Sequence, residues 1–250
     1  ELGVGCVTCH VTRDGVVWAA PSTNPNPAPH PVYRSEAFAM TGGCINCHEF
    51  GFPGIAVTSN DSDALLMQTT VREHARSASA KTPCADCHMP AIAGRRSHRF
   101  AEVRDPEWLR KNLTVTVQRN AHDSVEMTLQ QNRPGHAFPT GDLFRRLEVG
   151  AELRDARGRV IRRDIRHLSR RFVERPHGSG REMQGDERVF DAPLTIDLDV
   201  APQGKVTKSL RVFHWVKLQR VATVGPGLSA PDAVIESEVE LHSGEFAWSP

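Results

Sequence analysis

The 250-residue chain has few aromatic side chains, no long apolar run and no excess of either charge. It contains one tyrosine, four tryptophans and ten phenylalanines. No apolar stretch reaches the 18 or more residues that a membrane-spanning helix requires, so we expect no transmembrane segment. The formal net charge is +1, from 31 basic and 30 acidic residues, and this balance argues against a nucleic-acid partner.

No secretory leader is recognisable at the start of the sequence. Either a leader has been removed, or the sequence begins inside a longer protein. The second possibility matters because the first sequence motif opens at residue 6 and leaves almost no chain before it.

No cysteine is left over once the cysteines are grouped. The six form three pairs, each followed directly by a histidine: Cys6, Cys9 and His10; Cys44, Cys47 and His48; and Cys84, Cys87 and His88. C-x-x-C-H is the attachment motif of c-type haem. Two thiols on one helical turn reach the two vinyl groups of one porphyrin, and the histidine binds the iron from the same side. The sequence therefore predicts three covalent haems c, with the motif histidines as proximal ligands.

Zinc sites and disulfide bonds also use paired cysteines. Zinc needs four ligands, which two of these motifs could supply, but it gives no reason for a histidine after all three pairs. Disulfides give no reason for the histidines at all. With 12 histidines in 250 residues, three chance matches have odds of roughly one in ten thousand. Haem attachment is therefore the preferred interpretation, with zinc and disulfides as alternatives.

Residues 1–110 are expected to form a trihaem cytochrome c region. Short helix-like pieces alternate with loops such as the proline-rich segment 21–29. The region has too few large apolar residues for a core of side chains alone, and three macrocycles would supply the missing core. The motifs recur 38 and 40 residues apart, which indicates a haem-bearing unit used three times rather than a strict repeat.

Residues 111–250 show the period-two alternation that is typical of half-buried strands. The alternating positions are Val115 and Val117; Val125, Met127 and Leu129; and Leu147, Val149, Ala151 and Leu153, with further candidate strands at 159–168, 193–200, 205–215 and 233–242. Seven short strands without a long helix predict an antiparallel β-sandwich of immunoglobulin-like type. The expected fold class is therefore α+β, with a multihaem region of short helices and loops followed by this domain.

Nine histidines outside the motifs are candidates for the second axial position of the three irons. His74 lies on a predicted helix over 65–76 that leads into the third motif, from where it could bind a neighbouring iron. His98 follows the third motif among basic residues that could pair with haem propionates. His30 lies between two prolines, which hold it stiffly and suit either a ligand or an ordinary loop.

His136 lies in a turn cluster over 133–141 that contains two glycines and two prolines. Such a loop is rigid and projects its side chain, so we predict that the β-domain supplies a haem ligand from residues 135–141. The alternative is a structural histidine bonded to loop backbone. Five histidines are expected to be bystanders, with His122 near a strand turn and the rest on the sheet surface: His122, His167, His177, His214 and His242. Bis-histidine ligation is preferred over methionine ligation.

Residues 84–90, 97–100 and 135–141 resemble strings found in periplasmic and extracellular multihaem c-type cytochromes. The CHMP string over 87–90 also resembles part of pentahaem cytochrome c nitrite reductase. In such families the histidines of a GHxFPTG loop and of an HRF string commonly serve as distal ligands, which the resemblance implies for His136 and His98. It also implies a periplasmic or extracellular location. In motifs, it covers roughly residues 1–145.

Two departures separate the chain from enzymatic members of these families. It contains no C-x-x-C-K motif, which the catalytic haem of the nitrite reductases carries, and only Tyr33 is available for a tyrosine-linked haem of the hydroxylamine oxidoreductase kind. The expected function is electron transfer by a carrier or conduit with three six-coordinate haems and redox proteins as partners. The alternative is a multihaem oxidoreductase of the nitrite, hydroxylamine or peroxide class, with one open iron site.

Four good distal candidates for three irons leave one spare imidazole. It is either a bystander or a ligand of a haem on upstream sequence or on a neighbouring subunit. Residues 145–175 hold eleven arginines against five acids, while 232–245 hold five acids. Opposite patches permit a head-to-tail contact between copies. The alternative is two solvated strand faces, because exposed charge pairs contribute only about 0–1 kcal/mol each.

Overall fold

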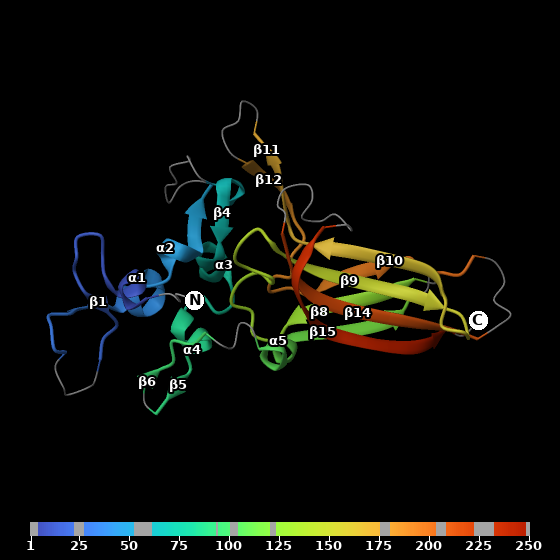
Figure 1. Ribbon diagram of the computed structural model, residues 1–250, viewed down its shortest axis with the longest axis horizontal. Helices are drawn as coiled ribbons and strands as arrows, with labels where there is room; N and C mark the ends of the chain where they lie inside the picture. Colours follow the sequence, from blue (N-terminus) through green and yellow to red (C-terminus); the bar gives the residue numbers. More distant parts are fainter. Residues whose placement is uncertain are drawn as a thin grey trace.

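The computed structural model is an elongated molecule with short helices at one end and larger sheets at the other (Figure 1). Strand accounts for 47% of it, and the helices are short. Within the described ranges, no helix has both the length and the apolar character needed to cross a bilayer. The structure describes residues 5–22, 28–52, 62–93, 95–100, 105–120, 124–175, 181–203, 209–222 and 233–248.

The part of the chain before residue 113 consists of short elements joined by loops. In chain order they are α1 (Cys6–His10), β1 (Trp18–Ala19), β2 (Tyr33–Arg34), the π-helix η1 (Phe38–Gly42), α2 (Ile45–His48), β3 (Glu49–Gly51), the 3₁₀ helix η2 (Asp63–Leu65), β4 (Leu66–Thr69), α3 (Thr70–Arg76), α4 (Cys84–His88), β5 (Ala91–Ile92), β6 (Arg95–Arg96) and α5 (Pro106–Asn112). Among its described residues up to 100, Phe52 and Leu66 are the buried apolar side chains. Side chains alone therefore give this part almost no core.

The helix predicted over 65–76 begins later than expected. Residues 66–69 form β4, which pairs antiparallel with β3, and only Thr70–Arg76 are α-helical. Leu66, Gln68 and Thr69 are buried in this hairpin. The pairing satisfies backbone groups that a helix would otherwise satisfy internally, so tertiary contact overrides the helical pattern here.

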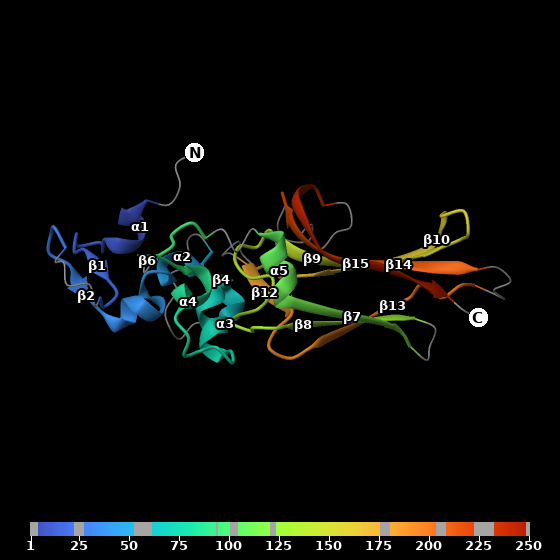
Figure 2. The same cartoon turned by 90° about the horizontal axis from the view of Figure 1, so that it is seen from below.

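The rest of the chain forms two main antiparallel sheets. One has the order β10-β9-β14-β15 and the other β13-β8-β7. Their strands are β7 (Leu113–Arg119), β8 (Val125–Gln131), β9 (Arg145–Arg154), β10 (Val160–Leu168), β13 (Leu194–Leu198), β14 (Leu210–Val221) and β15 (Ile235–Trp248). The sheets lie as two layers (Figure 2) and share one hydrophobic cluster.

The alternating positions predicted for β8 and β9 are confirmed. Every one of these seven side chains, from Val125 to Leu153, is fully buried, while Val115 and Val117 are partly buried against the same cluster. Period-two alternation gives the correct face because neighbouring side chains of a strand point to opposite sides of the sheet.

A hairpin of β11 (Arg170–Glu174) and β12 (Arg181–Asp186) was not predicted from the pattern. Its sequence is polar and lacks a clean alternation, since one side chain, Arg170, is buried where an apolar residue would be expected. Arg170 donates hydrogen bonds to the carbonyl oxygens of Leu66 (2.7 Å) and Met67 (3.0 Å). The hairpin is thus hydrogen-bonded to β4 and connects the two parts of the chain.

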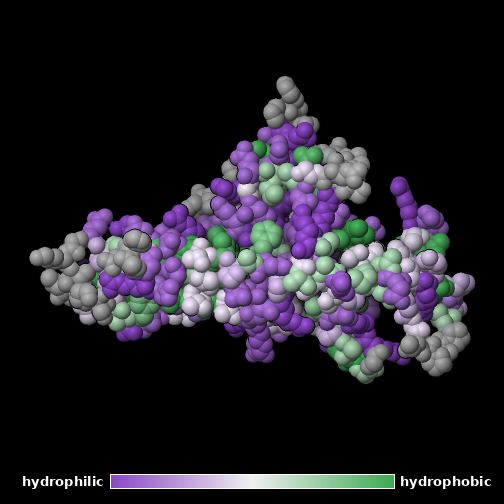
Figure 3. Space-filling view, turned by 180° about the vertical axis from the view of Figure 1, so that it is seen from behind, coloured by the Kyte–Doolittle hydropathy of each residue, from purple (hydrophilic) through white to green (hydrophobic). Residues whose placement is uncertain are grey.

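The charged patches at the two edges of the larger sheet are paired within the molecule. The face in Figure 3 is largely hydrophilic, with apolar residues only scattered over it. On and beside β10 and β15 the pairs are Arg162–Asp199, Arg163–Glu152, Arg166–Asp164, Arg211–Glu245, Lys217–Glu238 and Arg220–Glu236. These internal pairs reduce the charge that the two patches would present to another copy of the chain.

His214 is not the sheet-surface residue that we expected. It lies on the core side of β14, is 6% exposed and stacks on His242 of β15 with ring centroids 5.1 Å apart. Among the described residues, His214 Nδ1 and His242 Nε2 are buried without a hydrogen-bond partner. Burial, and secondly the neighbouring His242, lower the pKa of His214 to about 4. Burial also lowers the pKa of His242. His122 and His177 lie outside the described residues.

We expect this buried pair to make the sheets acid-sensitive. An unfolded histidine titrates near pH 6.5, so below that pH the unfolded state binds more protons than the folded one. We expect the free energy of unfolding to fall between pH 6.5 and 4, by at most about 3 kcal/mol through His214. Denaturant unfolding followed by circular dichroism at several pH values tests this. In the variant His214→Leu the pH slope should be shallower than in the wild type; equal slopes would contradict the prediction.

Candidate functional site

Each C-x-x-C-H motif forms about one turn of helix, in α1, at Cys44 and α2, and in α4. One turn carries the two thiols and the histidine of a motif on neighbouring positions, as the spacing predicts. The structure pairs none of the six cysteines, all of which it describes, in a disulfide. Among the described residues, no group of three or more histidine, cysteine, aspartate or glutamate side chains gathers as a metal site would require.

The three motifs lie close to one another. The thiols of Cys44 and Cys84, from the second and third motifs, are neighbours, and their interaction lowers the pKa of Cys84 to about 7 and raises that of Cys44. The pKa of Cys9 is raised by burial and then by the charges of Cys44 and Cys47. Groups attached at the three motifs would therefore be neighbours.

The first-motif histidine is held in a defined tautomer. His10 Nδ1 donates to the carbonyl oxygen of Trp18 at 2.9 Å, which leaves the lone pair of Nε2 free to bind a metal. His48 Nδ1 lies 2.8 Å from the side-chain amide of Gln68. Turning that amide by 180° places its oxygen on Nδ1–H and gives His48 the same tautomer, because the two amide atoms are interchangeable in shape.

His98 lies opposite His10. The two ring centroids are 6.1 Å apart and the ring planes are tilted by 44°. His98 Nδ1 donates to the carbonyl oxygen of Arg96 at 3.0 Å, so its Nε2 is also left free. With metal–nitrogen bonds of about 2 Å, two imidazoles that share one metal have centroids about 6 Å apart. This pair fits an iron between its members.

His136 lies opposite His88 in the same manner. The ring centroids are 5.9 Å apart and the planes are nearly parallel, at 10°. His136 Nδ1 donates to the carbonyl oxygen of Ala137 at 3.0 Å. Burial lowers the pKa of His136 and so favours the neutral form that binds metals. A loop of the strand-rich part thus reaches the third motif.

His74 has both ring nitrogens occupied. Nδ1 lies 2.8 Å from the carbonyl oxygen of Gly135, and Nε2 lies 2.9 Å from that of Thr82. In this arrangement each ring nitrogen faces a backbone carbonyl oxygen. His30 is exposed and bonds its neighbour, the carbonyl oxygen of Pro31, at 3.3 Å. Among the described residues, no ring contact joins His48 or His30 to another histidine.

A buried carboxylate fixes the loop that carries His136. Glu73 on α3 accepts hydrogen bonds from Arg188 (2.6 Å), the Thr69 hydroxyl (2.6 Å), the Thr140 hydroxyl (2.9 Å) and the backbone N–H of Ala137 (3.2 Å). Burial opposes ionisation of Glu73, but the Arg188 charge and these donors together lower its pKa. No motif marks Glu73 or Arg188 in the sequence, and they are 115 positions apart.

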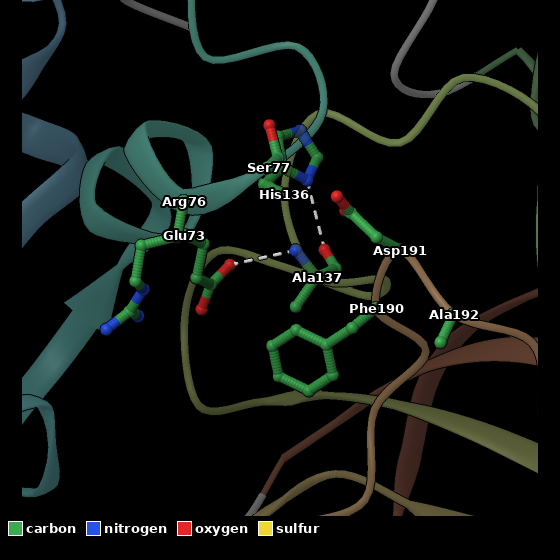
Figure 4. A pocket seen from close by; sticks show the side chains of 8 residues that line it. All are labelled: Glu73, Arg76, Ser77, His136, Ala137, Phe190, Asp191 and Ala192. Atoms are coloured by element: carbon green, nitrogen blue, oxygen red, sulfur yellow. Dashed lines mark hydrogen bonds between the residues drawn. The ribbon is translucent and has the colours of Figure 1, made fainter.

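Glu73 also lines a cavity of about 220 Å³ beside His136. Figure 4 shows the Glu73 carboxylate bonded to the N–H of Ala137 and the His136 ring bonded to the carbonyl oxygen of that residue. The lining residues are Glu73, Arg76, Ser77, His136, Ala137, Phe190, Asp191 and Ala192. The wall thus combines α3, the His136 loop and the segment after β12.

Comparison with known proteins gives one structural relationship. No family model matches the sequence, and no curated protein matches it either. The structure is similar to the crystal structure of a penta-haem cytochrome c552 from Thermochromatium tepidum, with a TM-score of 0.65 and 15% sequence identity. The match covers 98% of this chain and 77% of that one. This chain has the fold of a multihaem c-type cytochrome. At 15% identity the likeness concerns the fold alone.

The ion pair between Glu73 and Arg188 should be important for stability. Both side chains are almost inaccessible, so Arg188→Met leaves a buried carboxylate without its cation. We expect a loss of roughly 3–5 kcal/mol in the free energy of unfolding. The matched control is Arg220→Met. Its pair with Asp142 is partly exposed, and roughly 0–1 kcal/mol is expected. Denaturant unfolding measures both, and equal losses would contradict the prediction.

Proposed function

We propose that this chain carries three covalent haems c and transfers electrons between redox partner proteins. The observation that carries the proposal is the spacing of two histidine pairs, each with a motif histidine on one side and a second imidazole about 6 Å away. Haem iron held between two histidines supplies one-electron transfer with no open position for a substrate. The number of haems follows from the three motifs, whereas the structural neighbour is described as penta-haem.

The chain's own residues would divide the work as follows. The thiols of the six cysteines attach the three macrocycles, and His10, His48 and His88 bind the irons from the motif side. His98 completes the site of His10, and His136 completes that of His88. Closeness of the three motifs, indicated by the contact between Cys44 and Cys84, favours rapid transfer from one haem to the next.

The iron that His48 would bind has no assigned second axial ligand. His30 is the remaining candidate for its second axial position, since both nitrogens of His74 are occupied by carbonyl oxygens. Without His30, that iron would have a free position. The second candidate function, a multihaem oxidoreductase of the nitrite, hydroxylamine or peroxide class, rests on this observation.

The two sheets are proposed to form an immunoglobulin-like sandwich over residues 111–250, with residues 1–110 as the trihaem region. The shared hydrophobic cluster supports the face-to-face arrangement. A periplasmic or extracellular location is proposed because haem c is attached outside the cytoplasmic membrane in the cytochromes that the motifs resemble.

The haem count is tested by the intact mass of the native protein before and after haem removal. We expect a difference that corresponds to three haems per chain. A smaller difference, or zinc found by elemental analysis, would refute the proposal.

The optical spectrum of the oxidised protein then separates the two functions. Only low-spin haem is expected for the carrier, and a high-spin fraction that binds cyanide is expected for the enzyme.

Substitution of the distal histidines tests the ligand assignments one by one. We expect His98→Ala and His136→Ala each to convert one haem of three from low to high spin, because each iron loses one axial imidazole. His30→Ala should convert the third if His30 serves the iron of His48. His242→Ala is the matched control, as it removes an imidazole on β15, and an unchanged spectrum is expected. A spectrum that His136→Ala leaves unchanged would show a purely structural histidine.

A further inference from the structure

Two adjacent side chains of α3 hold the backbone on both sides of His136. Glu73 accepts from the N–H of Ala137, directly after His136, at 3.2 Å. His74 bonds the carbonyl oxygen of Gly135, directly before it, through Nδ1 at 2.8 Å. The peptide units that flank His136 are therefore tied to one helix, which restricts the direction in which the imidazole projects.

The second nitrogen of His74 reaches the other half of the same pair. Nε2 bonds the carbonyl oxygen of Thr82 at 2.9 Å, two residues before α4 begins at Cys84. Both partners of His74 are carbonyl oxygens, and the tautomer of the ring decides which of the two nitrogens donates its proton. One side chain thus bridges the loop that carries His136 and the segment that leads to His88.

The α3 helix is itself held in place, so it can position both the loop of His136 and the segment that leads to His88. The carboxylate of Glu73 receives four donors, including Arg188, which also bonds Asp186 at 2.7 Å. Glu73 is 5% exposed and His74 is 9% exposed, so water does not compete for these contacts. A further bond runs from the hydroxyl of Ser79 to the carbonyl oxygen of Pro134 at 2.6 Å. None of the side chains that form this network is exposed.

We infer that Glu73 and His74 are positioning residues for the axial pair of His88 and His136, and that His74 is not itself an iron ligand. The inference rests on the proposed function, because it concerns the iron that this pair would share. Neither residue touches that iron. Together they set the separation and the nearly parallel planes of the two rings, which are 5.9 Å apart at 10°.

Electron paramagnetic resonance of the oxidised holoprotein tests this directly. The g-values of low-spin haem depend on the angle between the planes of its two axial imidazoles, so they report ring orientation rather than stability. We expect His74→Gln and Glu73→Gln each to shift the signal of one haem, and the same haem, while the signals of the other two keep their positions. All three irons should stay low spin in His74→Gln.

The matched control for Glu73→Gln is Glu148→Gln. Glu148 on β9 is also a shielded carboxylate, and it accepts from Trp215 at 2.7 Å and Gln219 at 2.9 Å inside the strand-rich part. Its loss should lower stability and leave every haem signal in place. If Glu73→Gln does not fold, the pair Thr140→Val and Thr140→Ser replaces it. Valine removes the hydroxyl that Glu73 binds and should shift the signal, whereas serine keeps the hydroxyl and should not.

Three results would overturn the inference. One is an unchanged set of signals in His74→Gln and in both Glu73→Gln and Thr140→Val. Another is an equal shift of all three haems, which indicates general loosening. The third is a high-spin haem in His74→Gln with unperturbed signals elsewhere, which would make His74 a ligand. Fewer than three haems in the mass of the wild type would instead refute the proposed function, before any variant is made.

Discussion

The buried ion pair of Glu73 and Arg188 is the contact on which the arrangement of the candidate site depends. It joins α3, from the part of the chain that is poor in core residues, to the segment after β12 in the strand-rich part. A carboxylate taken out of water is tolerated only with strong partners, and Glu73 has four. Two of those partners, Ala137 and Thr140, belong to the loop that presents His136. The contacts that compensate the buried charge of Glu73 therefore also hold the loop of His136 in place.

The two parts of the molecule solve different packing problems. The strand-rich part has a hydrophobic cluster between two sheets, which fixes β8 and β9 and the loop between them. The part before residue 113 has almost no buried apolar side chains among its described residues. Its segments are held instead by polar contacts to the strand-rich part, such as those of Arg170 with the carbonyl oxygens of β4. Three attached macrocycles would add the apolar volume that the side chains do not provide.

Local features were predictable where a short stretch of sequence contains the whole physical cause. The three C-x-x-C-H motifs became helical turns, and the apolar positions from Val125 to Leu153 became the buried faces of two strands. The sequence pattern gave the wrong expectation where a partner distant in the sequence determines the local structure. Residues 66–69 form a strand because β3 pairs with them, and His214 is buried because the face of β14 turns inward. The polar sequence of the β11 and β12 hairpin does not predict strands, because an arginine, Arg170, is buried there beside Phe172.

The sequence by itself determined the chemistry of the groups: six thiols, three motif histidines and a rigid loop around His136, all coded within a few residues. Only the tertiary structure decided which imidazoles face each other. It set His98 opposite His10 and His136 opposite His88, and it engaged both nitrogens of His74 with backbone carbonyls. The reason is physical. A motif fixes side chains that share one helical turn, whereas the pairing of rings from different segments depends on long-range contacts such as that of Glu73 with Arg188, which no local pattern records.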